Sequence, residues 1–155
     1  MSPLAERMYL RAFAFAAILT LAVAAPVSAQ IMEMNGTWEM IPDKCLGSWP
    51  DQETLVFKSI EGIQRYTATW TDDGESGGRE YEIQYDGHDH AASSELADTV
   101  SVRRLGEKSE FVVNKRDGQI AETYTRVLVD DDGTLISVGR SATGEVRWVR
   151  VFEKQ

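Results

Sequence analysis

The chain has 155 residues, a formal net charge of −9 at pH 7 and a single cysteine. So large an acidic excess repels phosphate groups, which argues against nucleic acid and anionic membrane surfaces as partners. One thiol cannot form a disulfide within the chain, so the fold must be held together by its own core.

The N-terminal segment has the three parts of a secretory signal peptide. Two arginines precede an apolar run over residues 12–25, and Val27-Ser28-Ala29 provides a small-x-small cleavage site. The run is shorter than the ~20 residues that a membrane-spanning helix needs. We therefore expect cleavage after Ala29, which gives a signal peptide over residues 1–29 and a mature domain over residues 30–155. That domain is expected to be periplasmic or secreted, with no membrane span.

Beyond residue 30 the pattern alternates with period two, in short β-rich runs separated by turn sequences. Pairs such as Asp86-Gly87 and Asp117-Gly118 place a glycine where a hairpin turn needs positive φ. A tenth, marginal strand is expected near residues 88–93. The nine clearer strands are predicted, in chain order, over residues 36–41, 54–59, 64–71, 79–85, 99–105, 110–115, 120–129, 134–140 and 146–152.

These strands are joined mostly by tight turns with no helical crossover, so neighbours in sequence should be neighbours in the sheet. Such a sheet hides its two edges by closing on itself. An open sandwich usually needs a longer Greek-key connection, whereas the longer irregular stretches here, residues 42–53 and 71–78, fit loops at a barrel mouth. We therefore predict an all-β fold, a single antiparallel up-and-down (meander) β-barrel of about 8–10 strands.

Two motifs at the ends of the domain carry a family resemblance. Gly36-Thr37-Trp38 on the first strand and the run from Arg147 to Lys154 on the last resemble the calycin pattern of lipocalins and fatty-acid-binding proteins. In that pattern the first-strand tryptophan packs near the barrel floor beneath an arginine from the last strand. The resemblance therefore implies that Gly36, Trp38 and Arg150 close the barrel, with Arg147 as the alternative arginine.

The mature chain as a whole also resembles a group of small exported bacterial lipocalin-like proteins, mostly uncharacterised. They share a Gly-Thr-Trp start and later Asp-Gly turns, and Cys45 stands here where serine is usual in that group. The motifs are specific for a fold and do not identify a ligand.

Polar residues on the strand predicted over residues 120–129 are the first binding candidates. Alternation places Glu122, Tyr124 and Arg126 on one face, but both faces of the strand are mixed. If this face points inward, Tyr124 and Arg126 form the phenol and guanidinium pair with which calycin cavities commonly grip an anionic head group. If it points outward, the same residues form a surface ladder of charges.

Aromatic side chains on two adjacent strands are the second set of candidates. They either line a cavity or fill it as ordinary core. The tentative ligand-binding residues are therefore Tyr66, Trp70, Tyr85, Tyr124 and Arg126.

His88-Asp89-His90 is the sequence feature that most suggests a metal site, because it puts two imidazoles on one face of an extended segment. No further histidine or zinc motif accompanies it, so we predict a solvated loop and no cofactor. Cys45 has no histidine near it in sequence, and neither a Gly-x-Ser-x-Gly elbow nor a phosphate-binding loop occurs in the mature chain. We therefore predict no catalytic residues.

The sequence thus predicts a non-enzymatic exported barrel that binds a small, partly apolar ligand in its interior. The alternative is a filled barrel that acts through its surface as an envelope-stress, inhibitory or assembly factor. The loop from Pro42 to Glu53, which carries Trp49, would then contact the partner protein. A third hypothesis is enzymatic, with barrel-lining arginine and tyrosine residues assisting isomerisation or cyclisation of a bound molecule.

Overall fold

A computed structural model describes residues 34–131 and 133–155 of the chain. The predicted signal peptide lies outside the described residues. No helix in the described part is long and apolar enough to span a membrane. The described elements are β1 (Gly36–Met40), the 3₁₀ turn η1 (Pro42–Lys44), β2 (Leu46–Gly47), β3 (Gln52–Ile60), β4 (Ile63–Asp72), β5 (Glu75–Ile83), β6 (His90–Ser94), β7 (Thr99–Gly106), β8 (Ser109–Arg116), β9 (Gln119–Val129), β10 (Thr134–Ser141) and β11 (Val146–Lys154).

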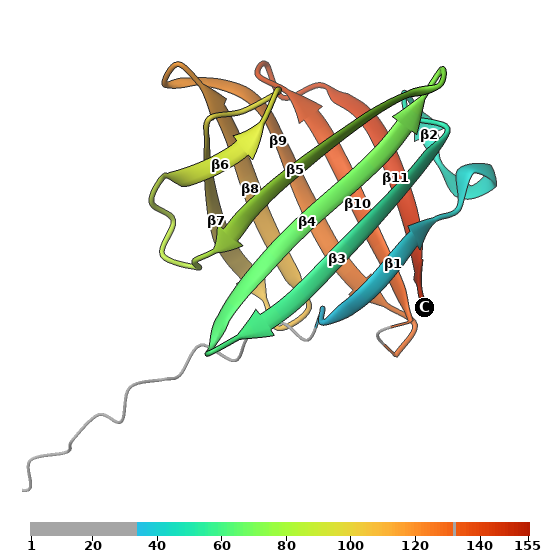
Figure 1. Cartoon of the computed structure of the whole chain (residues 1–155), viewed down its shortest axis with the longest axis horizontal. Helices are drawn as coiled ribbons and strands as arrows, with labels where there is room; N and C mark the ends of the chain where they lie inside the picture. Colours follow the sequence, from blue (N-terminus) through green and yellow to red (C-terminus); the bar gives the residue numbers. More distant parts are fainter. Residues whose placement is uncertain (1–33, 132) are drawn as a thin grey trace, which may run out of the picture.

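The strands form one antiparallel sheet that closes on itself, because β1 pairs with both β3 and β11. Figure 1 shows the resulting barrel from the side, with its strands tilted. β1 and β2 pair with successive parts of one edge of β11, so β2 continues the line of β1 after η1. The ring therefore has ten strands, and the predicted all-β meander barrel is confirmed.

The barrel wall is less continuous at β6 than elsewhere. β6 makes three register pairs with β5 and two with β7, whereas β4 and β5 make nine. The marginal strand of the sequence analysis is therefore real but short. The first residues of β5, from Glu75 to Gly78, have no partner on β6.

Alternation along each strand determines what faces the interior. In β3, for example, Glu53, Leu55 and Phe57 are buried while the residues between them are more exposed. Aromatic and branched side chains fill the barrel and leave an interior void of about 10 Å³. That is room for about one water molecule. The interior is therefore a packed core rather than an open ligand chamber.

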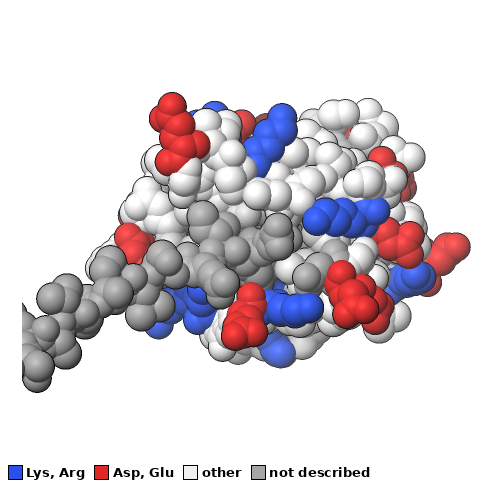
Figure 2. Space-filling model, turned by 90° about the horizontal axis from the view of Figure 1, so that it is seen from below, with Lys and Arg blue, Asp and Glu red and all other residues white. Residues whose placement is uncertain are grey.

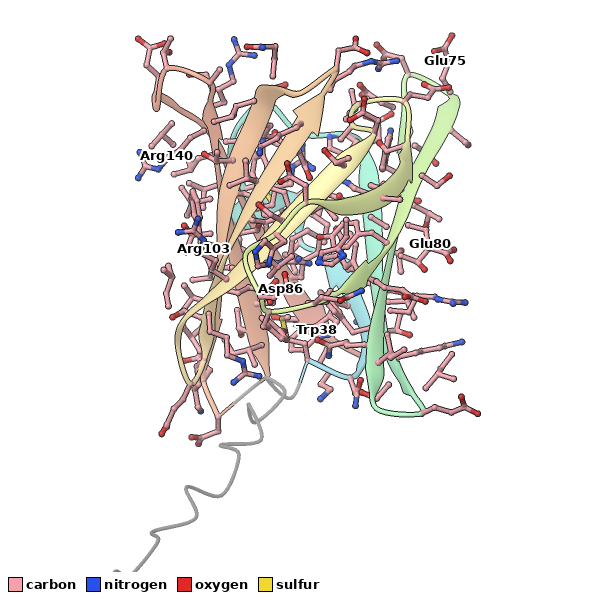
Figure 3. All side chains as sticks on the ribbon, turned by 90° about the vertical axis from the view of Figure 1, so that its left-hand side faces the viewer. Trp38, Glu75, Glu80, Asp86, Arg103 and Arg140 are labelled. Carbon is pink, nitrogen blue, oxygen red and sulfur yellow. The ribbon has the colours of Figure 1, made fainter. Side chains whose placement is uncertain are left out.

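Trp38 closes the lower end of the barrel. Its side chain is fully buried, and its Nε1–H donates a hydrogen bond of 2.8 Å to the Met34 carbonyl. Figure 3 shows Trp38 inside the lower part of the barrel, and Figure 2 views this end from below, where acidic and basic side chains are interspersed. Gly36 has φ of 134°, a backbone conformation that residues with a side chain rarely adopt, so glycine is favoured at this position.

The prediction that Arg150 packs over Trp38 is wrong. The register sets Trp38 directly opposite Lys154, whose Nζ lies 5.4 Å from the centroid of the indole ring. Arg150 lies further along β11, where its guanidinium stacks 4.2 Å from the ring of Trp148, and Arg147 is exposed. The cation that covers the closing tryptophan is therefore a lysine at the end of the last strand.

Candidate functional site: the barrel mouth

A pocket of about 260 Å³ lies beside the β2–β3 loop and the end of β4, which are at the upper end of the barrel in Figure 1. Trp38 lies toward the opposite end (Figure 3). Side chains from the β2–β3 loop, the end of β4, β5, the β6–β7 loop, β9 and β11 surround it. It is lined by Ser48, Trp49, Pro50, Trp70, Asp72, Arg79, Glu95, Leu96, Glu122 and Arg150. Four of these residues supply apolar surface, and five of the other six are charged.

Two tryptophans near this pocket each lie against a glycine on the neighbouring strand. Trp70 faces Gly77 across the β4–β5 pair, and Trp148 faces Gly139 across the β10–β11 pair. A Cβ atom at either glycine would overlap the indole ring. The two glycines therefore let large rings lie flat on the inner wall, which fixes the shape of the barrel below its mouth.

The floor of the pocket is a network of two arginines and two glutamates. Arg150 Nη1 donates a 2.7 Å hydrogen bond to Glu53 Oε2, and the Trp148 indole donates one of 2.9 Å to Glu122 Oε1. Arg79 stands between the two carboxylates, 3.9 Å from Glu53 and 3.8 Å from Glu122. The positive and negative charges of this floor therefore balance.

Arg79 is the least satisfied member of the floor. Its side chain is only 8 % exposed, yet neither Nε nor Nη1 has a hydrogen-bond partner among the described residues. Its guanidinium lies 5.5 Å from the ring of Trp70 and 5.7 Å from that of Tyr124. Buried polar groups without partners are uncommon and costly. Arg79 therefore presents buried donors beside the pocket that an acceptor atom can satisfy.

A second ion pair lies deeper in the barrel, between Arg126 and Glu110. Arg126 Nε lies 2.6 Å from Glu110 Oε1, and both side chains are almost fully buried. Burial alone would lower the pKa of Arg126, but the Glu110 carboxylate helps to hold that pKa well above its ordinary value. The arginine stays charged and its charge is neutralised within the core.

Tyrosine rings enclose this inner ion pair. Arg126 Nη2 donates a 2.8 Å hydrogen bond to the Tyr81 hydroxyl, which also lies 2.8 Å from that of Tyr124. The ring of Tyr66 stacks 4.7 Å from that of Tyr81 and 4.4 Å from the Arg126 guanidinium. Burial, which disfavours phenolate, raises the pKa of Tyr66 and of Tyr81.

We expect the protein to lose stability in alkaline solution because of these buried phenols. Unfolding returns Tyr66 and Tyr81 to water, where their pKa falls to the ordinary value of 10.0. Their contribution is complete below that pH and is lost above it, by about 1.4 kcal/mol per pH unit for each phenol. Urea unfolding at stepped alkaline pH measures the slope. Tyr66→Phe should flatten it, and an unchanged slope would contradict the assignment.

The five tentative ligand-binding residues occupy three different environments. Trp70 lines the mouth pocket, while Tyr66, Tyr124 and Arg126 surround the small interior void below it. The strand face whose direction was open therefore points inward. Tyr85 lines neither space, and its hydroxyl lies 3.0 Å from both Gln64 Oε1 and Glu110 Oε2, the carboxylate that pairs with Arg126.

The histidine segment makes no metal centre with its neighbours. His90 Nε2 lies 3.0 Å from both carboxylate oxygens of Asp86, and His88 is largely exposed near the same carboxylate. Within residues 34–131 and 133–155, no group of three or more candidate ligands is suited to a metal ion. The hydrogen bonds tie His90 to the preceding turn.

Sequence reasoning missed Glu53, Arg79 and Glu110 as inward residues. Each is in phase with buried neighbours two and four positions away, as in the series Glu53, Leu55, Phe57, and for Glu110 these neighbours are Val112 and Asn114. The sequence signal that was available is a charged residue at a position where the alternation expects an inward apolar residue. It marks a buried ion pair when a second strand carries the opposite charge in the same phase.

Comparison with solved structures shows which known fold the chain resembles. No family model and no curated protein sequence matches the chain. Among solved structures, the wild-type fluorescent protein UnaG superposes with a TM-score of 0.52 at 18 % identity, over 78 % of this chain and 96 % of UnaG. The fold is that of the lipocalin and fatty-acid-binding-protein barrels. A point variant of UnaG matches at a TM-score of 0.49 and 17 % identity, over 77 % of this chain and 94 % of its own.

Proposed function

We propose that this calycin-like barrel is a binding protein that takes a small, partly apolar molecule at its mouth. The observation that supports this most is the pocket of about 260 Å³, which joins the apolar surfaces of Trp49, Trp70 and Leu96 to the buried donors of Arg79. Pockets of a few hundred Å³ with apolar walls and few convergent polar groups are typical of small-molecule sites. Export directed by the predicted leader would present the site outside the cytoplasm.

Because the interior is filled, we expect the ligand to bind at the mouth rather than inside the barrel. With about 10 Å³ free below the floor, no organic molecule fits beside Tyr124 and Arg126 unless the core rearranges. The mouth offers the larger space and needs no such rearrangement. We therefore assign binding to the mouth pocket and a structural role to the inner ion pair.

Indole N–H signals in NMR spectra test the proposal, because the chain has four tryptophans at distinct places. Titration with benzamide, an uncharged planar amide, should shift the signals of Trp49 and Trp70 progressively. The Trp38 signal should not move, since that indole is buried at the opposite end. Shifts confined to Trp38, or none at all, would contradict mouth binding.

Trp70→Leu should weaken benzamide binding about five- to tenfold, because the stacking surface is removed. Trp38→Phe is the matched control at the other end and should leave the dissociation constant unchanged. Equal losses in both variants would show that benzamide responds to the stability of the barrel rather than to its mouth.

The filled interior also favours a second candidate, a barrel that binds another protein through its surface. Trp49 is 36 % exposed and Leu96 53 % exposed, and both lie at the rim of the mouth. A photo-crosslinking residue at Trp49 should then capture a defined partner in the exporting cell. The same residue at Ile60, which is 50 % exposed on the β3–β4 hairpin at the other end, is the control.

A further inference from the structure

We propose that the mouth pocket selects a small organic cation, with an uncharged carbonyl-type acceptor at its inner end and an amine at its outer end, and that it discriminates against carboxylates. This inference rests on the proposed function and specifies the chemistry of its ligand. Three features carry it: the balanced charge of the floor, the acidic rim, and the apolar surface that lines the same pocket.

The floor offers donors without a net positive charge. Arg79 already faces two carboxylates, Glu53 at 3.9 Å and Glu122 at 3.8 Å. Glu53 is also held by Arg150, so the two arginines and two glutamates cancel. A third carboxylate placed on Arg79 would lie close to both glutamates and be repelled by them. A carbonyl oxygen that reaches Nε or Nη1 of Arg79, which lack a hydrogen-bond partner among the described residues, accepts a hydrogen bond and adds no charge.

The rim of the pocket is acidic. Asp72 and Glu95 line it, and Asp73 and Glu75 extend the same surface over the β4–β5 turn. None of these four carboxylates forms an ion pair with another described residue. Figure 3 shows Glu75 at the upper edge of the barrel. Carboxylates gathered on one side of an opening raise the local concentration of cations and repel anions.

Two basic residues at the upper end are engaged by other partners. Lys115 is bound to Asp89 at 2.7 Å, and Arg140 points outward and donates to the Gly144 carbonyl. Within the described chain, the cations that line the pocket are Arg79 and Arg150, both already committed to glutamates of the floor. Among the charged residues that line the pocket, those without an ion-pair partner among the described residues are therefore the acidic residues of the rim, Asp72 and Glu95.

The pocket also has apolar surface. Trp49, Trp70 and Leu96 line it together with the charged residues. Indole faces attract cations as well as flat apolar groups. A compact hydrophobic or aromatic body with an inner carbonyl and an outer amine therefore meets a complementary group at each level.

Three matched probes with one aromatic body test this selection. They are phenylalaninamide, which is cationic at about pH 6, N-acetylphenylalaninamide, which is neutral, and N-acetylphenylalanine, which is anionic. The Trp70 indole signal of the ¹⁵N-labelled protein reports each titration. We expect the cation to bind at least about fivefold more tightly than the anion at low salt, with the neutral amide between them. High salt should reduce the differences in affinity among the three probes.

Neutralising the rim should abolish the preference. Asp72→Asn combined with Glu95→Gln should bring the cation to the affinity of the neutral amide and leave the neutral amide unchanged. Glu80→Gln is the matched control, because it removes a carboxylate that points outward from the wall of β5 and pairs with Arg65. That control should keep the order of the three probes.

Two results would overturn the inference in different ways. If N-acetylphenylalanine binds most tightly while still shifting Trp70, the mouth is a binding site and its proposed chemistry is wrong. If none of the three probes shifts Trp49 or Trp70, the proposed function fails as well. A cation preference that survives neutralisation of Asp72 and Glu95 would also refute the role assigned to the rim.

Discussion

Replacing Arg126 with methionine should lower the free energy of unfolding by about 3–5 kcal/mol, because it leaves a buried carboxylate without its partner. Glu110 is fully buried and lies 2.6 Å from Arg126 Nε. The same change removes the cation that stacks on Tyr66 and Phe57, at 4.4 and 5.0 Å from their centroids. Urea unfolding followed by circular dichroism gives the free energy.

A double variant separates the stranded charge from simple loss of packing. Arg126→Met with Glu110→Leu removes both charges and should recover most of the loss, since apolar replacement of a buried ion pair is often neutral. The neighbouring phenols keep other contacts, Tyr81 with Tyr124 and Tyr85 with Gln64. If the double variant is no more stable than Arg126→Met, the ion pair does not explain the effect.

The surface ion pair of Arg65 provides the control for Arg126→Met. Arg65 is half-exposed and pairs with Glu82 at 3.2 Å, so Arg65→Met should change stability by no more than about 0.5 kcal/mol. If Arg126→Met instead keeps the native stability and weakens benzamide binding, Arg126 acts as a ligand-binding residue. That outcome would restore the role considered from the sequence.

Trp38→Ala is expected to cost a further large amount, about 3–5 kcal/mol, because it empties a fully enclosed site at the bottom of the barrel. The indole is packed beneath the Lys154 side chain and donates to the Met34 carbonyl. Trp38→Phe should cost less, since it keeps most of the ring volume and leaves one carbonyl without a donor. Denaturant unfolding of both variants checks the order.

The same substitution at the mouth is the comparison for Trp38→Ala. Trp49 is partly exposed, so Trp49→Ala should cost less than about 1 kcal/mol. Equal losses at the two positions would contradict the view that Trp38 closes the barrel. If Trp38→Phe loses probe binding while its stability is unchanged, the ligand binds at the Trp38 end of the barrel and not at the mouth.

Sequence patterns predicted the barrel because neighbouring residues determine most of its strand pairings. Each hairpin is indicated by a turn sequence between two alternating runs, and the strand order follows from the short connections. The predicted cation partner of Trp38 was wrong because that contact depends on residues far apart in the sequence. The β1–β11 register joins the two ends of the domain, and a shift of a few residues along β11 exchanges Lys154 for Arg150 as the covering cation.

The site was less predictable than the fold because inward polar residues break the usual rule that charges are solvated. Tyr124 and Arg126 were recognised as a pair, but the strand that carries them has mixed faces, so its direction stayed open. Glu110, the carboxylate that neutralises Arg126, lies on another strand, so the residues next to Arg126 in the sequence do not reveal it. Whether rings line a cavity or fill it depends on their combined volume, which no single strand reveals.

The short pairing of β6 has a kinetic consequence for a molecule held at the mouth. Arg79 lies opposite Ser94, at the last register pair before the β5–β6 ladder ends. Few hydrogen bonds must break there for the wall to part, so this seam should open far more often than the barrel unfolds. We expect separation of β5 and β6 beside Arg79 to add a second route of entry and exit next to the open mouth. Residence time can thus change without any change in the residues that contact the ligand.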